Sequence, residues 1–140
     1  MSGIIGGAGS KSGVIGTTEL NYEEGTWTPT FQNDTDGLAL YDAVYRVVGD
    51  LVIAHFSCTV NTTSDASAIN FSLPFTASVL TDSGNFQGGF LTFNNSGHDS
   101  KPVITRGAAA AHVMDNSGGY SSYSSFSGDA LSGTVIYIRA

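Results

Sequence analysis

Residue types that often do chemistry are few in this chain and lie far apart. The three histidines are His55, His98 and His112, and none belongs to a set of donors with metal-ligand spacing. His112 and Asp115 are three residues apart, a spacing that brings side chains together on a helix but not on a strand. We therefore expect no metal site.

Local motifs for catalysis are also missing. No Gly-x-Ser-x-Gly run singles out a serine nucleophile. Glu23 and Glu24 are adjacent, so on a strand their carboxylates point to opposite faces and do not converge on one bond. In the glycine-rich run 7–12, Ser10 replaces the glycine that a phosphate loop places before Lys-Ser. We expect a protein that is not an enzyme and binds no cofactor.

Charge narrows the classes of partner. The net charge of −7 argues against nucleic acid and anionic membranes, because phosphate groups are neutralised by Lys and Arg side chains. No run approaches the roughly 18 apolar residues of a membrane span, and no basic segment starts a signal peptide. The single cysteine, Cys58, excludes an internal disulfide and fits a buried strand position. We expect neither a nucleic-acid partner nor membrane insertion.

The elements that must position any site are predicted to be strands. Polar residues are mainly Ser, Thr, Asn and Gly, which suit turns and solvent-facing strand positions, and strong helix formers are scarce. The clearest strand is 51–60, where one face is wholly apolar: Val52, Ala54, Phe56, Cys58 and Val60. We expect this face in the core. The other face begins with Leu51, Ile53 and His55, and we expect it to contact another subunit or the N-terminal segment.

The remaining pattern predicts an antiparallel β-sandwich of jelly-roll type over residues 25–140. Its first, edge strand is 25–31, which places Trp27 and Phe31 on one face and includes Pro29. The double glycine Gly88-Gly89 indicates a bulge or a close crossing. Further strands are predicted, with 108–114 assigned as a strand despite its alanines: 38–48, 69–75, 86–93, 102–106, 108–114 and 131–140.

Residues 1–24 form an extended Gly/Ser/Ile segment, called the arm below. Within it Ser2-Gly3-Ile4-Ile5-Gly6 recurs ten residues later as Ser12-Gly13-Val14-Ile15-Gly16. Glycine carries a high ordering cost, so one interpretation is a flexible terminus. The other is a docking segment whose apolar pairs pack against a partner: Ile4, Ile5, Val14 and Ile15. The paired β-branched residues favour docking.

A C-terminal run carries aromatic residues at every third position: Tyr120, Tyr123 and Phe126. Tyrosines in Ser/Gly loops make adaptable contact surfaces, so these three are candidate contacts for a receptor or glycan. The alternative is that they fill the core beneath an irregular segment. The spacing alone leaves both interpretations open.

Three runs resemble the β-sandwich domain of tail fibres, head fibres and related appendages of tailed phages, notably those of marine bacteria: Gly25-Thr26-Trp27-Thr28-Pro29, Tyr45-Arg46-Val47-Val48-Gly49-Asp50-Leu51-Val52 and Ser72-Leu73-Pro74-Phe75. Residues 9–19 are similar to the lead-in of such domains. Leu131-Ser132-Gly133-Thr134 is similar to the start of their last strand.

The resemblance implies a non-enzymatic virion protein, usually a homotrimer, whose arm attaches it to other virion proteins. Trp27 would then be a core or intersubunit anchor. Long fibres carry a shaft before this domain, and the short arm here favours a capsid decoration protein, a short head fibre or a compact fibre tip. The alternative is a tail-fibre tip module that binds a host receptor or glycan during adsorption.

Overall fold

The computed structural model describes residues 21–32, 38–79, 86–94, 100–105 and 107–140. These residues form nine strands and one short 3-10 helix, and no α-helix occurs among them. In chain order the elements are β1 Tyr22–Thr26, β2 Phe31–Gln32, β3 Leu38–Val48, β4 Leu51–Val60, β5 Asn70–Ser72, β6 Phe86–Phe93, β7 Ser100–Thr105, β8 Ala110–Asp115, η1 Tyr123–Phe126 and β9 Ala130–Ile138.

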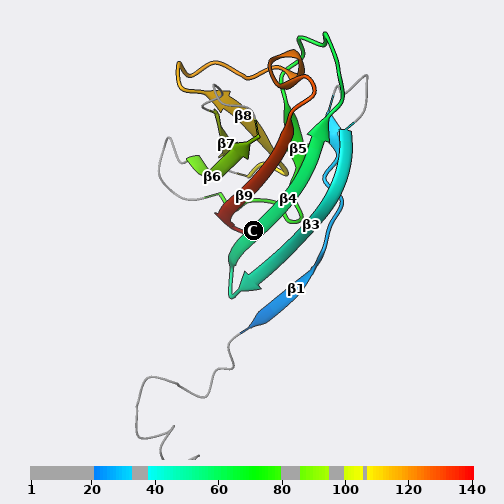
Figure 1. Ribbon diagram of the computed structural model, residues 1–140. Coiled ribbons are helices and arrows are strands. Elements are labelled where there is room, and N and C mark those ends of the chain that lie inside the picture. The colour runs from blue at the N-terminus through cyan, green and yellow to red at the C-terminus, as the bar shows by residue number, and fades with distance from the viewer. Residues whose placement is uncertain (1–20, 33–37, 80–85, 95–99, 106) are drawn as a thin grey trace, which may run out of the picture.

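All nine strands belong to one antiparallel sheet in the order β1-β3-β4-β9-β6-β7-β8-β5-β2. The sheet curls into a half-barrel. Figure 1 shows β3, β4 and β9 as long curved neighbours, with β6, β7 and β8 turned away from them. The prediction of an all-β, antiparallel domain is confirmed. A two-sheet jelly-roll sandwich is not confirmed, because the ladder hydrogen bonds join every strand into the same sheet.

The two edges of the sheet are formed by one stretch of chain. β1 pairs with β3 at one edge, and β2 pairs with β5 at the other. Between them, the amide of Trp27 donates to the carbonyl of Ala43 in β3 at 3.1 Å. The carbonyl of Thr30 accepts from the amide of Ser72 in β5 at 2.9 Å. The chain therefore changes pairing partner within four residues and links both sides of the curled sheet.

The prediction that residues 25–31 form a single strand is wrong. β1 ends at Thr26 and β2 begins at Phe31. Pro29 lies between them, is buried, and lacks the amide proton that a ladder needs. Trp27 and Phe31 nevertheless both contact the core, as their common face predicts.

The core lies on the inner side of the curled sheet. The apolar face of strand 51–60 is buried as predicted, with Val52, Ala54, Phe56 and Cys58 all at 0% exposure. The ring of Phe56 lies at the centre of an aromatic cluster, with centroid distances of 6.4 Å to Trp27, 6.0 Å to Phe31 and 4.7 Å to Phe71. These edge-on and tilted arrangements are the favoured ones for aromatic pairs.

The double glycine of β6 lies where neighbouring backbones approach closely. A Cβ on Gly89 would overlap the carbonyl oxygen of Thr134 in β9. A Cβ on Gly88 would lie 2.6 Å from the carbonyl oxygen of Pro102 in β7. The predicted close crossing is thus confirmed, and it explains why both positions are glycine.

Other predicted strands are found with different bounds. Residues 108–114 do form a strand, β8, so neighbouring side chains along it alternate between its faces. The strand expected over 69–75 is shortened to the three residues of β5. Its inward residues Ile69, Phe71 and Leu73 are still buried. No helix in the described part of the chain is long and apolar enough to cross a membrane.

Candidate assembly surface

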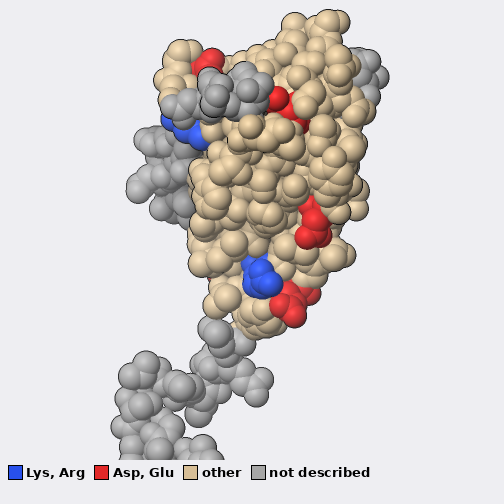
Figure 2. Space-filling view, viewed as in Figure 1, with Lys and Arg blue, Asp and Glu red and all other residues tan. Residues whose placement is uncertain are grey.

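The outer side of the sheet carries no charge across three neighbouring strands. The 10 residues of β4, the 9 of β9 and the 8 of β6 include no Asp, Glu, Lys or Arg. A sheet face in water normally carries polar and charged side chains, because one face is solvated while the other packs on the core. Figure 2 shows the result as a broad uncharged surface over β4 and β9, whereas β3 beside them carries Asp42 and Arg46.

Large apolar side chains are exposed on this surface. The β-ladder register places Val48 opposite Leu51, and Ile53 opposite both Arg46 and Ile136. Five side chains make up what we call the outer apolar face, with exposed fractions of 37–57%: Val48, Leu51, Ile53, Ile136 and Phe90. Single exposed apolar residues are ordinary, but a group on adjoining strands is a candidate surface for contact with a partner.

Polar residues beside the outer apolar face are bonded to one another. His55 in β4 lies opposite Thr134 in β9, and its Nδ1 is 3.1 Å from the Thr134 hydroxyl. The hydroxyl of Ser132 lies 3.5 Å from Nε2 of the same ring, at the limit of a hydrogen bond. The side chains of His55, Thr134 and Ser132 form these hydrogen bonds without a charged partner.

Charged groups are found at the rim, on β1 and β3. Arg46 Nε lies 3.8 Å from Glu24 Oε2, and both side chains are 62% exposed. The hydroxyl of Tyr22 donates to the same carboxylate at 2.6 Å, and this hydrogen bond raises the pKa of Tyr22. An apolar, uncharged centre with a polar rim is the usual anatomy of a protein–protein interface.

Sequence reasoning found part of this surface. Leu51, Ile53 and His55 lie together on the outer side of β4, as predicted. Trp27 does not join them, because its half-buried ring faces inward and packs edge-on against Phe56. Its indole Nε1 is buried and has no hydrogen-bond partner among the described residues. The structure thus places Trp27 as a core anchor of the monomer.

Three members of the outer apolar face were not predicted. Val48, Ile136 and Phe90 each lie on a strand other than β4. The alternation of β9 does indicate that Ile136 points away from the core. What the sequence lacks is the strand order, which places β9 and β6 beside β4 although they are distant along the chain.

The predicted docking residues of the arm, Ile4, Ile5, Val14 and Ile15, lie outside the described residues. The described chain begins at Asn21, whose carbonyl accepts from the amide of Gly49 at 2.7 Å. Gly49 belongs to the turn between β3 and β4. Residues 22–24, expected to belong to the arm, lie in strand β1, so the rest of the arm joins the domain at Asn21, next to one end of the outer apolar face.

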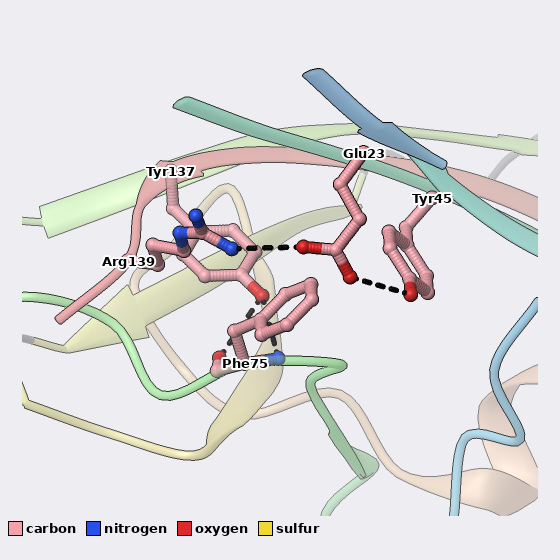
Figure 3. A network of polar contacts seen from close by, with 5 residues as sticks. All are labelled: Glu23, Tyr45, Phe75, Tyr137 and Arg139. Carbon is pink, nitrogen blue, oxygen red and sulfur yellow. Dashed lines mark hydrogen bonds and ion pairs between the residues drawn. The ribbon is translucent and has the colours of Figure 1, made fainter. Parts of the chain in front are cut away.

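A network of polar contacts, called the clasp below, lies on the inner side of β1 (Figure 3). Arg139 Nη1 lies 3.2 Å from Glu23 Oε2, and the hydroxyl of Tyr45 donates to Glu23 Oε1 at 3.0 Å. The Arg139 guanidinium also lies over the ring of Phe75, 5.3 Å from its centroid. Glu23 thus bonds inward while its neighbour Glu24 bonds outward, which confirms the predicted divergence of the two carboxylates.

The clasp joins the first strand to the last. Glu23 lies in β1, and Arg139 directly follows β9. The hydroxyl of Tyr137 donates to the carbonyl of Phe75 at 2.9 Å and accepts from its amide at 3.1 Å. Burial raises the pKa of Tyr137 to about 12, and the hydrogen bond to Glu23 raises the pKa of Tyr45. The clasp therefore secures the strand from which the arm extends.

The aromatic series at 120–126 does not form one contact surface. Tyr123 and Phe126 lie in η1 and are each 1% exposed. The Tyr123 hydroxyl donates to the carbonyl of Gln32 at 2.8 Å, and Phe126 stacks on Phe93 with a centroid distance of 4.5 Å. The proposal of receptor contacts at these two residues is thus corrected, because a 3-10 turn directs both rings into the core. Tyr120 remains 61% exposed.

Comparison with known proteins found no matching family model, curated protein or solved structure. In the described ranges, no group of three or more His, Cys, Asp or Glu side chains has the geometry to hold a metal ion.

Proposed function

We propose that the chain is a non-enzymatic structural protein of a phage virion. Its copies associate through the outer apolar face into a homotrimer, and its arm attaches the assembly to other virion proteins. The observation that carries the proposal is the charge-free outer side of β4, β9 and β6 with its five exposed apolar side chains. The finer jelly-roll arrangement expected of such appendages belongs to the same proposal.

The distribution of charge makes the outer apolar face the place where another copy of the same chain can bind. Each copy carries a net charge of −7, so copies repel one another through most orientations. The outer apolar face has no charge to oppose contact. Arg46 at the rim also has an excess of acidic partners available on a neighbouring copy. Like copies can therefore meet through this face without placing equal charges together.

The apolar area available is enough for a specific but modest association. Fully burying a large aliphatic or aromatic side chain is worth about 1.5–3 kcal/mol. The five side chains of the outer apolar face are still 37–57% exposed. Covering them would contribute about 3–6 kcal/mol per copy, before the cost of lost translational and rotational freedom. Several copies must therefore contribute together for a stable assembly.

The resemblance to phage appendage domains supplies the virion setting, and the position of the arm agrees with it. The arm joins the domain at Asn21, and the clasp secures the adjoining strand β1. Removing residues 2–16 should leave the domain folded and abolish attachment to the particle; undiminished attachment would refute the docking role.

A charge placed in the centre of the face tests the assembly directly. Ile53→Lys should convert the oligomer to monomers, because a buried unpaired ammonium is strongly unfavourable. Thr62→Lys adds the same charge at an exposed loop position and serves as the matched control. Analytical ultracentrifugation should find monomers for Ile53→Lys alone. An unchanged oligomer with Ile53→Lys would refute self-association through this face.

A further inference from the structure

One ionisable side chain, His55, lies on the outer side of the uncharged strands. β4, β9 and β6 contain no Asp, Glu, Lys or Arg, and their Cys58 and Tyr137 are buried on the inner side. His55 is half-buried near the middle of β4. Among these three strands, it is therefore the only outward-facing group that changes charge near neutral pH.

The β-ladder places His55 among the members of the outer apolar face. In the row that crosses the sheet, Val44 of β3 and Thr134 of β9 lie on either side of it, and Phe90 of β6 lies beyond Thr134. Ile53 precedes it by two residues on the same side of β4. A partner that covers Ile53 and Phe90 must therefore also cover the ring of His55.

In the described ranges, the strands packed against β4 bring charge near His55 only from β3. Asp42 and Arg46 lie one row to either side of the His55 row on the outer side of β3. Both side chains are exposed, and their opposite signs largely offset each other at the imidazole ring. Arg46 also lies 3.8 Å from the carboxylate of Glu24 in β1. β9, on the other side of β4, contributes hydroxyl and apolar groups but no charge.

Hydrogen bonds within the row suit both the neutral and the protonated ring. Nδ1 of His55 is 3.1 Å from the Thr134 hydroxyl, and Nε2 is 3.5 Å from the Ser132 hydroxyl. A hydroxyl group can donate or accept, so it can bond to a ring nitrogen with or without a proton. In a separate copy, water also reaches the half-buried ring. A free copy can therefore carry the protonated ring at little cost.

Contact between copies changes the surroundings of His55. A second copy that binds through the same face brings the same three strands, which contain no carboxylate to pair with an imidazolium. It also brings a second His55, whose positive charge would repel the first. Burying an ion without a partner is unfavourable, so contact favours the neutral ring. Assembled copies thus bind fewer protons than free copies do.

We propose that His55 makes the self-association of this chain sensitive to acid. The inference rests on the proposed association through the outer apolar face. Because free copies bind the extra proton more readily, association is strongest above about pH 7 and weakens as the pH falls through the range in which imidazole groups gain a proton.

The sign of this pH dependence separates it from the effect of net charge. Acidification makes a chain of net charge −7 less negative, and the reduced repulsion between copies would by itself strengthen association. Weaker association in acid therefore indicates a group whose charged form opposes contact.

Sedimentation equilibrium of the full chain at about pH 7.5 and about pH 5.5, at one ionic strength, tests the proposal. For the wild type we expect association at the higher pH and about tenfold weaker association at the lower pH, because burial commonly shifts the protonation of an ionisable group by a factor of ten or more. Circular dichroism at both pH values verifies that the domain stays folded. Association that is unchanged or stronger at the lower pH would overturn the proposal.

Two variants of His55 and a matched control assign the effect. His55→Gln keeps hydrogen-bonding groups without a charge and should associate at least as well at the lower pH as at the higher. His55→Lys is charged at both pH values and should be monomeric at both. His112→Gln removes a histidine from β8, which β9, β6 and β7 separate from β4, and should weaken in acid as the wild type does.

The outcomes distinguish this inference from the proposed self-association. Acid-induced weakening that persists in His55→Gln, or wild-type association in His55→Lys at either pH, would overturn the role of His55 while leaving self-association intact. A wild type that is monomeric at both pH values would instead refute self-association itself, and the inference with it.

Discussion

Removing Arg139 from the clasp should loosen the strand that carries the arm. The Arg139 side chain is 19% exposed and contacts both the Glu23 carboxylate, at 3.2 Å, and the ring of Phe75. Exposed ion pairs contribute about 0.2–1 kcal/mol to stability. We expect a contribution in this range here, because the Glu23 side chain is 43% exposed to solvent. A cation over an aromatic ring adds about 0.5–1 kcal/mol. We therefore expect Arg139→Gln to lower the free energy of unfolding by about 1–2 kcal/mol.

A double-mutant cycle separates the ion pair from the other contacts. Glu23→Gln keeps an oxygen that can accept from the Tyr45 hydroxyl, so the pair of variants isolates the charge interaction. Urea unfolding of the wild type, both single variants and the double variant should give a coupling energy of about 0.5–1 kcal/mol, decreasing with added salt. Arg46→Gln provides the comparison for a pair at 3.8 Å with both side chains 62% exposed.

Hydrogen exchange locates the effect. In Arg139→Gln the amides of β1 should exchange faster, while those of β4 and β9 change only with global stability. A coupling energy of zero, together with unchanged exchange in β1, would refute the role assigned to the clasp.

Three further predictions follow from packing and ionisation. The pKa of the Tyr137 hydroxyl is raised to about 12 in the folded protein, so on raising the pH the unfolded chain loses this proton before the folded protein does. The free energy of unfolding should therefore be constant below pH 10 and fall by up to about 2.7 kcal/mol between pH 10 and 12. Urea unfolding at each pH checks this, and the Tyr137→Phe variant should show a smaller fall. Gly89→Ala should lower the free energy of unfolding by about 3 kcal/mol or more, or prevent folding, because the new Cβ would overlap the Thr134 carbonyl. Thermal melting followed by circular dichroism checks this, and a melting temperature near that of the wild type would contradict it. Trp27→Ala should lower the free energy of unfolding by about 2–3 kcal/mol, which is less than the loss for a fully buried Trp, because the Trp27 ring is half-buried against Phe56. A loss below about 1 kcal/mol in urea unfolding would contradict its role as a core anchor.

Local pattern predicted the two faces of a strand more closely than its bounds. Alternation along residues 51–60 identified both faces of β4, because strand side chains alternate with a period of two residues. The glycine pair of β6 predicts a bulge or a close crossing, and the structure confirms the close crossing, since no Cβ fits at either position. Such features depend only on neighbouring residues in the chain.

Features that depend on the order of strands in the sheet could not be predicted from the local sequence pattern. The outer apolar face joins Ile53 to Ile136 and Phe90, which come from strands far apart in sequence. The clasp likewise pairs Glu23 with Arg139 across 116 residues. The inward turn of Tyr123 depends on η1, whose contacts with β2 and β6 are not visible in the run 120–127 itself.

The central claim is that copies of the chain cover the outer apolar face. Thiol labelling tests it most directly, because the native Cys58 is fully buried and should not react. Ile53→Cys and Thr62→Cys place one new thiol on the face and one in an exposed loop, and labelling rates are measured over a dilution series. We predict that Thr62→Cys reacts rapidly throughout, while Ile53→Cys is protected at high concentration and becomes reactive on dilution. Equal rates for both variants at every concentration would contradict the claim.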